Sequence, residues 1–312
     1  MPILETNGIR THYVQFNAGS GEPREELVMV HGLGTNLAFW YMPHAVAFSE
    51  RFRVTLFDLR GHGRSSMPER GYQPGTFAGD LRALLDGLGI ERAHFVAHSF
   101  GGVVVLNLAC LDPGRFIDLV LADTQVYAVR HKRPPQAWAF GKTLQPLLER
   151  NGIDVKVDDP YFGYHLLERI ARVETEGRRL SPELAPLLGP IVGNGARRTA
   201  KQWLDLLSNT RAEEELMTDD GLTGERLRGL GFPILAMYGE RSHSAHCGEW
   251  LRELWDHASF SLVPDAGHFF PSSRPQLFIE ECRRFWQDSS PAGNVPAPAV
   301  NGKSIPPIGR TH

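Results

Sequence analysis

The sequence has few cysteines and no long apolar run. Only three cysteines occur in 312 residues, at Cys110, Cys247 and Cys282, and they are too few and too scattered for a disulfide framework or a zinc cluster. No stretch of about 18 consecutive apolar residues is present, and the first residues lack the pattern of a signal peptide. We therefore expect a cytoplasmic protein without a membrane span, a bound metal or a cofactor.

An excess of charge of one sign is also missing. Lysine and arginine total 33 against 36 aspartates and glutamates, which gives a formal net charge of -3. This balance offers no electrostatic reason to bind nucleic acid or an anionic membrane. The hydrophobic fraction of 42% and the charged fraction of 22% are ordinary for a folded globular protein. A small-molecule substrate is the expected partner, and the oligomeric state is left open.

Short apolar runs alternate with helical patterns in the first part of the chain and again near its end. Such alternation predicts an α/β fold, in which helices flank a mostly parallel sheet. The runs read as strands lie at 27–30, 53–57, 93–97, 119–122, 233–238 and 259–263.

Between the fourth and fifth of these runs the apolar spacing is helical only. We therefore predict a helical cap over 125–230, inserted between a first core part at 1–124 and a second at 231–287. The remaining residues, 288–312, are rich in proline, alanine and glycine and are predicted to form a flexible tail.

The segment Val96-Ala-His-Ser99-Phe-Gly-Gly102 joins a buried strand to an apolar helix. This is the context of a nucleophile elbow, where a strained turn exposes a serine hydroxyl and small neighbours avoid clashes. Ser99 is the candidate nucleophile. Because a helix begins directly after it, the backbone N–H of Phe100 is expected to stabilise an oxyanion.

Two further loops follow predicted strands and complete the candidate site. His31-Gly-Leu33-Gly34 follows the first predicted strand, and its glycines let the backbone approach closely, so the Leu33 N–H is the expected second oxyanion donor. His268 follows the last predicted strand in Asp265-Ala-Gly-His268. It is the candidate general base.

Together with Asp58-Leu-Arg-Gly-His-Gly63-Arg-Ser65, these motifs resemble the α/β-hydrolase superfamily over about residues 5 to 287. The resemblance implies a site whose residues occur in the order serine, acid, histidine. It also implies hydrolytic chemistry, while the motifs recur in esterases, lactonases, thioesterases and some lyases.

The acid of the triad departs from the usual pattern of that superfamily. The strand after the cap is usually followed by Gly-Glu-x-Asp, but this chain has Gly239-Glu-Arg-Ser242. Two carboxylates can take the role, Asp123 at the end of the strand before the cap and Glu240 after the cap. We favour Asp123, because sites in open α/β sheets lie at the carboxyl ends of the strands.

Aromatic residues of the core loops and the cap are candidates for the wall of a substrate pocket. Trp40, Trp138 and Tyr161 are assigned to substrate binding, since the oxyanion loop and the cap would enclose the space above Ser99. For the cap residues Trp138 and Tyr161, packing in a core is the competing interpretation.

The sequence thus predicts a serine hydrolase that cleaves a carboxylic ester, lactone or thioester of a small apolar substrate through an acyl-enzyme. Two alternatives stay open. One is a cofactor-free lyase or cyclase that uses the serine and histidine for proton transfer, and the other is a ligand-binding protein without turnover.

Overall fold

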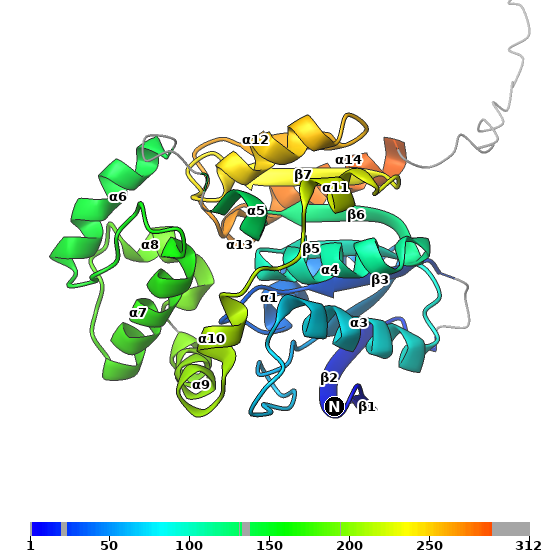
Figure 1. Cartoon of the computed structure of the whole chain (residues 1–312), viewed down its shortest axis with the longest axis horizontal. Helices are drawn as coiled ribbons and strands as arrows, with labels where there is room; N and C mark the ends of the chain where they lie inside the picture. Colours follow the sequence, from blue (N-terminus) through cyan, green and yellow to red (C-terminus); the bar gives the residue numbers. More distant parts are fainter. Residues whose placement is uncertain (1, 20–23, 131, 133–137, 194, 289–312) are drawn as a thin grey trace, which may run out of the picture.

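A single eight-stranded sheet is the centre of the structure, which is a computed structural model describing residues 2–19, 24–130, 132, 138–193 and 195–288 (Figure 1). The strand order is β1-β2-β4-β3-β5-β6-β7-β8. The strands are β1 (Ile3–Thr6), β2 (Ile9–Phe16), β3 (Glu26–Val30), β4 (Arg53–Phe57), β5 (Ala93–His98), β6 (Phe116–Ala122), β7 (Ile234–Gly239) and β8 (Ser259–Val263).

Strands β3 to β8 pair in parallel, which confirms the predicted α/β fold. Every residue of β5 and of β7 is buried. Strands of a parallel sheet are covered on both faces, so they consist of nearly continuous apolar runs. This is why the sequence pattern located them.

The two N-terminal strands were not among the predicted strands. β1 pairs with β2, and β2 pairs with β4, in both cases antiparallel. β1 alternates exposed and half-buried residues, as expected for an edge strand. A strand of this kind has no continuous apolar run by which the sequence pattern could identify it.

Helices cover both faces of the sheet. One face is packed by α3, α4 and α12, whose buried residues include Leu81, Val104 and Leu251. The other face is packed by α1, α2, α13 and α14, with Trp40 and Phe278 among the buried residues. These helices are α1 (Ala38–Trp40), η1 (Tyr41–Ala45), α2 (Val46–Phe48), α3 (Pro74–Leu88), α4 (Phe100–Leu111), η2 (Pro113–Arg115), α12 (Ala245–Leu254), α13 (Phe270–Ser273) and α14 (Pro275–Asp288).

The remaining helices lie between β6 and β7 in the sequence, inside the predicted cap range 125–230. We call this segment the helical insertion. Figure 1 shows its α6, α7, α8 and α9 grouped beside the sheet. Its helices are α5 (Tyr127–Arg130), α6 (Ala139–Arg150), α7 (Phe162–Glu176), α8 (Ala185–Leu188), η3 (Gly189–Ile191), α9 (Ala196–Asn209), α10 (Ala212–Leu216) and α11 (Gly224–Arg228).

The helical insertion packs in two different ways. α6, α7 and α8 share an apolar cluster of their own, which includes Leu148, Ile170 and Leu188. Residues of α9 to α11, such as Trp203 and Leu227, belong to the cluster that also covers the sheet. The second half of the insertion is therefore continuous with the core, and the first half is a separate apolar layer.

Polar contacts fasten the second half of the insertion to the core. The buried carboxylate of Glu215 accepts the backbone N–H groups of Gly71 at 2.8 Å and Tyr72 at 2.6 Å. Gln202 donates its side-chain amide to the carbonyl of Gly63 at 2.9 Å. These bonds link α9 and α10 to the loops that follow β4.

Within the described residues, no helix combines the length and the apolar character needed to cross a membrane. The predicted tail at 288–312 lies outside the described residues, apart from Asp288, the last residue of α14.

We predict that Glu215→Ala destabilises the protein by about 2–4 kcal/mol, because two buried N–H groups lose their acceptor. Chemical denaturation measures this as a lower midpoint. Glu213→Ala is the matched control, since Glu213 is exposed on the same helix, and it should change stability by less than about 0.5 kcal/mol. Equal effects of the two variants would contradict the role given to Glu215.

Candidate active site

Ser99 occupies a strained turn between β5 and α4. Its backbone has φ 56° and ψ -124°, a conformation that non-glycine residues rarely adopt. The close packing around the turn explains the small residues that follow: a Cβ on Gly101 would lie 2.6 Å from the carbonyl oxygens of Val30 and His31. The turn exposes part of Ser99 at the carboxyl edge of the sheet.

The pairing of the strands explains why three distant segments meet here. His98, the last residue of β5, pairs with Ala122 of β6, and Ala122 pairs with Met237 of β7. The next residues, Ser99 and Asp123, therefore leave neighbouring strands at the same edge. This edge is where open α/β sheets place their ligands.

A chain of hydrogen bonds joins Ser99, His268 and Asp123. His268 Nε2 lies 3.0 Å from Ser99 Oγ, and His268 Nδ1 lies 3.0 Å from Asp123 Oδ1. A carboxylate only accepts hydrogen bonds, so Nδ1 carries the proton and donates to Asp123. Nε2 is then free to accept the hydroxyl proton of Ser99.

Asp123 is fully buried, and its carboxylate is surrounded by donors. Besides His268, the backbone N–H of Gly239 donates to Oδ2 at 2.8 Å, and the hydroxyl of Ser242 donates to Oδ1. Ser242 in turn accepts the backbone N–H of Ser244 at 3.1 Å. The serine at the position of the usual acid therefore contacts the carboxylate that faces His268.

Glu240, the other candidate acid, lies elsewhere. Its carboxylate accepts the backbone N–H of Asp265 at 2.9 Å, at an exposed position. Both carboxylates were candidates for the acid of the triad. The structure places Asp123 against His268, whereas Glu240 contacts the backbone of Asp265.

The expected oxyanion donors lie on either side of Ser99. Phe100 is the first residue of α4, and the first N–H groups of a helix have no partner within it. Leu33 lies in the loop after β3, where a Cβ on Gly32 would approach Ser99 Cβ to 3.0 Å. The next residue, Gly34, donates its N–H to His62 Nε2 at 3.2 Å, which holds the loop in place.

His98 supports the loop that carries His268. Its Nε2 donates to the carbonyl of His268 at 2.9 Å, and its ring stacks on Phe39 with centroids 4.7 Å apart. Burial lowers the pKa of His98 well below its ordinary value. The ring is therefore neutral and acts as a fixed donor to the backbone.

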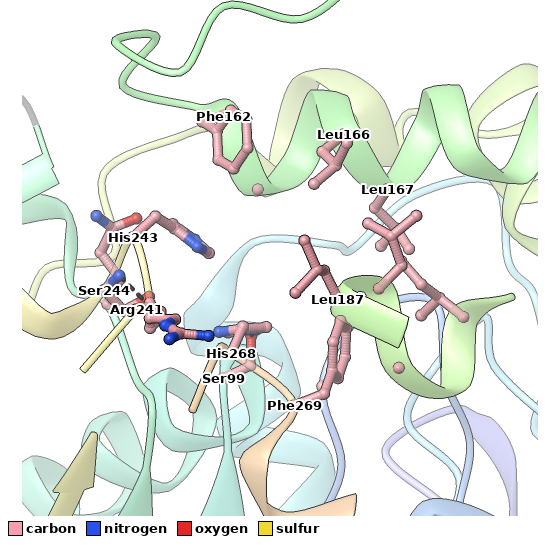
Figure 2. Close-up of a pocket in the computed structure, with 18 of the residues that line it drawn as sticks. Ser99, Phe162, Leu166, Leu167, Leu187, Arg241, His243, Ser244, His268 and Phe269 are labelled. Atoms are coloured by element: carbon pink, nitrogen blue, oxygen red, sulfur yellow. Dashed lines mark hydrogen bonds between the residues drawn. The ribbon is translucent and has the colours of Figure 1, made fainter. Parts of the chain in front are cut away.

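A cavity of about 330 Å³ opens above Ser99 and His268. Figure 2 shows Phe162, Leu166 and Leu167 of α7 on the side of the cavity opposite Ser99 and His268. The wall is mostly apolar and also contains Leu144, Leu187, Leu188, Ile191, Leu216 and Phe269. Most of these side chains could not be identified as pocket residues from the sequence, because an apolar position in a helix is equally typical of a core.

Trp138 and Tyr161 line this cavity, as expected, but Trp40 does not. Trp40 is 0% exposed and packs against Phe278 with ring centroids 5.5 Å apart. Its place next to the oxyanion loop in the sequence suggested a pocket residue. The ring instead lies in the apolar cluster that packs one face of the sheet. The assignment of Trp40 to substrate binding therefore does not hold.

No group of three potential metal ligands occurs among the described histidine, cysteine, aspartate and glutamate residues. Cys247 is fully buried, and burial raises the pKa of its thiol to about 12. His243 lies on the cavity wall, with its ring 5.0 Å from that of His268.

Comparison with known proteins agrees with this fold. The model of the family described as "alpha/beta hydrolase fold" matches residues 26–275. The chain therefore belongs to the α/β-hydrolase fold family.

Similar proteins identify the enzyme class. The chain is 39% identical over 276 residues, 85% of its length and 92% of the other, to "Putative carbamate hydrolase RutD" of Caulobacter sp. strain K31. A segment of 121 residues, 39% of this chain and 44% of the other, is 35% identical to 3-oxoadipate enol-lactonase 2 of Acinetobacter baylyi. The crystal structure of a hydrolase from Pseudomonas aeruginosa PA01 is similar with a TM-score of 0.62 and 25% identity, covering 91% of this chain and 97% of that one. The chain is a hydrolase of this fold.

Buried neutral histidines make the stability of the protein depend on pH. Burial lowers the pKa of His44 to about 4 and that of His62 to about 3, while an unfolded histidine titrates near about 6.5. Below about pH 6.5 the unfolded chain therefore binds protons that the folded chain does not. Each such histidine costs about 1.4 kcal/mol of stability per pH unit until its folded pKa is reached.

We predict that His44→Gln reduces this pH dependence. The glutamine amide can still donate to the carbonyl of Pro271, which His44 Nε2 contacts at 2.9 Å, but it cannot take up a proton. Between pH 6.5 and 4.5, the loss of stability should be smaller by about 1.4 kcal/mol per pH unit. Denaturation at several pH values measures the slope, and the exposed His257 provides the control variant His257→Gln. An unchanged slope in His44→Gln would refute the assignment.

Proposed function

We propose that the protein hydrolyses a carboxylic ester, lactone or thioester of a small apolar substrate through an acyl-enzyme. The observation that carries this proposal is the hydrogen-bonded chain of Ser99, His268 and Asp123 at the floor of an apolar cavity. Nucleophile, base and orienting acid in this order are the requirements of serine-type acyl transfer.

In the first half of the reaction, Ser99 Oγ attacks the carbonyl carbon of the substrate while its proton moves to His268 Nε2. The tetrahedral intermediate collapses, the bond to the alcohol or thiol breaks, and the proton on His268 passes to that leaving group. Asp123 keeps His268 in the required tautomer and stabilises the imidazolium that forms.

In the second half, a water molecule gives a proton to His268 Nε2 and its oxygen attacks the acyl carbon. Collapse of the second intermediate releases the carboxylic acid, and the proton returns to Ser99. The N–H groups of Leu33 and Phe100 are the proposed donors to the oxyanion in both halves. Losing one such donor typically costs about 2.7–4 kcal/mol of transition-state stabilisation.

The cavity supports the choice of an apolar substrate. Residues of the helical insertion, among them apolar side chains of α6, α7 and α8, form about half of its wall, which supports the role of cap that the sequence predicts for 125–230. An apolar wall excludes water from the site. The hydrogen bonds to the oxyanion are stronger in this low-dielectric environment. Carbamates belong in the set of test substrates, because the relative matched over 92% of its length is named for them.

A lyase or cyclase that uses Ser99 and His268 only for proton transfer is the second candidate. The similar proteins favour the hydrolase, because the relatives matched here are named as a carbamate hydrolase and an enol-lactonase. The two mechanisms differ in one observable species, the acyl-enzyme. A binding protein without turnover would form neither product nor acyl-enzyme.

We predict that the protein turns over p-nitrophenyl esters and acyl thioesters of graded chain length, and that Ser99→Ala lowers kcat/KM by about 10⁴-fold or more. Mass spectrometry of the wild type after rapid mixing should show the mass of one acyl group on the peptide that contains Ser99. Turnover that survives in Ser99→Ala, or product without an acylated peptide, would contradict the proposed mechanism.

We predict further that Asp123→Asn lowers kcat by about 10³–10⁴-fold, because the imidazole loses the acceptor that fixes its tautomer. Glu240→Gln is the matched control, since it makes the same chemical change at the other carboxylate, and it should alter kcat by less than about threefold. The acid would be assigned to Glu240 instead if the two variants showed the reverse pattern.

A further inference from the structure

The wall of the cavity carries positive charge in a protein of negative net charge. Three arginines line it, Arg130, Arg241 and Arg274, together with a single described acidic residue, Asp265. The whole chain has a formal net charge of -3. A low-dielectric cavity concentrates the field of the charges on its wall, so an arginine without a partner there would attract an anionic group.

Two of the three arginines are accounted for without a ligand. Arg241 forms an ion pair with Asp265 at 2.5 Å and lies over the ring of Phe140 at 5.5 Å. Arg274 is exposed at the end of α13, where water screens its charge.

Arg130 is different, because part of its guanidinium is buried without a hydrogen-bond partner. Its Nε is buried and makes no hydrogen bond. The guanidinium carbon lies 4.9 Å from the centroid of the Tyr161 ring, and Tyr161 is held in turn by a hydrogen bond from its hydroxyl to the carbonyl of Met217 at 2.9 Å. The stacking fixes the direction of a planar donor on the cavity wall.

Asp220 is the acidic residue that interacts electrostatically with Arg130, but it does not form an ion pair with it. The carboxylate oxygens of Asp220 accept the backbone N–H groups of Tyr127 at 2.7 Å and Leu222 at 3.0 Å. Within the described part of the chain, no ion pair joins Arg130 to a carboxylate. Arg130 lines the cavity, so an anionic oxygen beside its guanidinium would form a charge-assisted hydrogen bond.

We propose that Arg130 binds a carboxylate of the substrate, so that the preferred substrates are apolar esters, lactones or thioesters that also carry a free carboxylate. The inference rests on the proposed function of Ser99 and names the substrate class of the same site. The apolar side chains of α7 and α8 contact the hydrocarbon part, and Arg130 pairs with the charged end.

The test compares esters that differ only in the presence of a carboxylate. Ethyl hexanoate is the neutral reference, monoethyl adipate carries the charge on the acyl chain, and carboxymethyl hexanoate carries it on the alcohol. A pH-stat measures the kcat/KM of each. We expect the wild type to prefer at least one charged ester over the reference, and Arg130→Gln to lower that ratio by about tenfold or more.

Two variants separate charge recognition from structural damage. Arg130→Lys keeps the charge but loses the planar fork, so its ratio should lie between those of the wild type and Arg130→Gln. Arg172→Gln removes an exposed arginine of α7 that pairs with Glu168, and its ratio should equal that of the wild type. A ratio near one in the wild type, or equal loss on charged and neutral esters in Arg130→Gln, would overturn the proposal.

A binding measurement on Ser99→Ala distinguishes failure of this inference from failure of the proposed function. Isothermal titration with adipate, hexanoate and 1-hexanol requires no turnover. Binding of a carboxylate that weakens about tenfold or more on adding Arg130→Gln supports the charge-binding role, even if no ester is hydrolysed. Equal affinity for 1-hexanol and the carboxylates, or affinity that is unchanged by Arg130→Gln, counts against it.

Discussion

The buried carboxylate of Asp123 is the interaction on which the site depends. An ionised group that is fully removed from water must be surrounded by donors, and here the donors come from three places: His268, the Gly239 backbone and the Ser242 hydroxyl. Gly239 ends β7, Ser242 lies in the loop after it, His268 lies in the loop after β8, and Asp123 itself follows β6. The requirement to satisfy one carboxylate therefore fixes the relative positions of three loops, and the imidazole is oriented as a result.

Backbone strain and the packing of the sheet also determine the positions of Ser99 and Asp123. Both Ser99 and Asp123 have positive φ values, 56° and 53°, at the ends of neighbouring strands. Such conformations cost energy and persist only where the surroundings over-determine them. The parallel sheet provides those surroundings, because β5 and β6 are almost completely buried and their ends cannot shift independently. The catalytic geometry is thus a property of the sheet edge as a whole.

Prediction from the sequence succeeded where local pattern and chemistry coincide. The parallel strands were visible as apolar runs, and the segment around Ser99 was visible because its turn requires small residues. The strands β1 and β2 were missed, since half-exposed strands lack that pattern. The assignment of Trp40 to the substrate pocket was wrong. Neither its proximity to the oxyanion loop nor its aromatic character indicates whether a short helix directs the side chain toward the pocket or into the core. The rule that sites lie at the carboxyl ends of the strands favoured Asp123 over Glu240, but only the long-range register shows which carboxylate faces His268. The unpaired Nε of Arg130 has no signal in the sequence.

The contact between Ser242 and Asp123 bears on how such sites change in evolution. Asp123 directly follows β6 and Ser242 lies in the loop after the neighbouring β7, and their side chains form a hydrogen bond. Aspartates at both positions would place two carboxylates together in a buried space, where only one can be ionised near neutral pH. A hydroxyl at one position removes this conflict and donates to the remaining charge. The position after β6 and the position after β7 are therefore close enough that a single carboxylate at either one could face the histidine, while the histidine and the nucleophile keep their places.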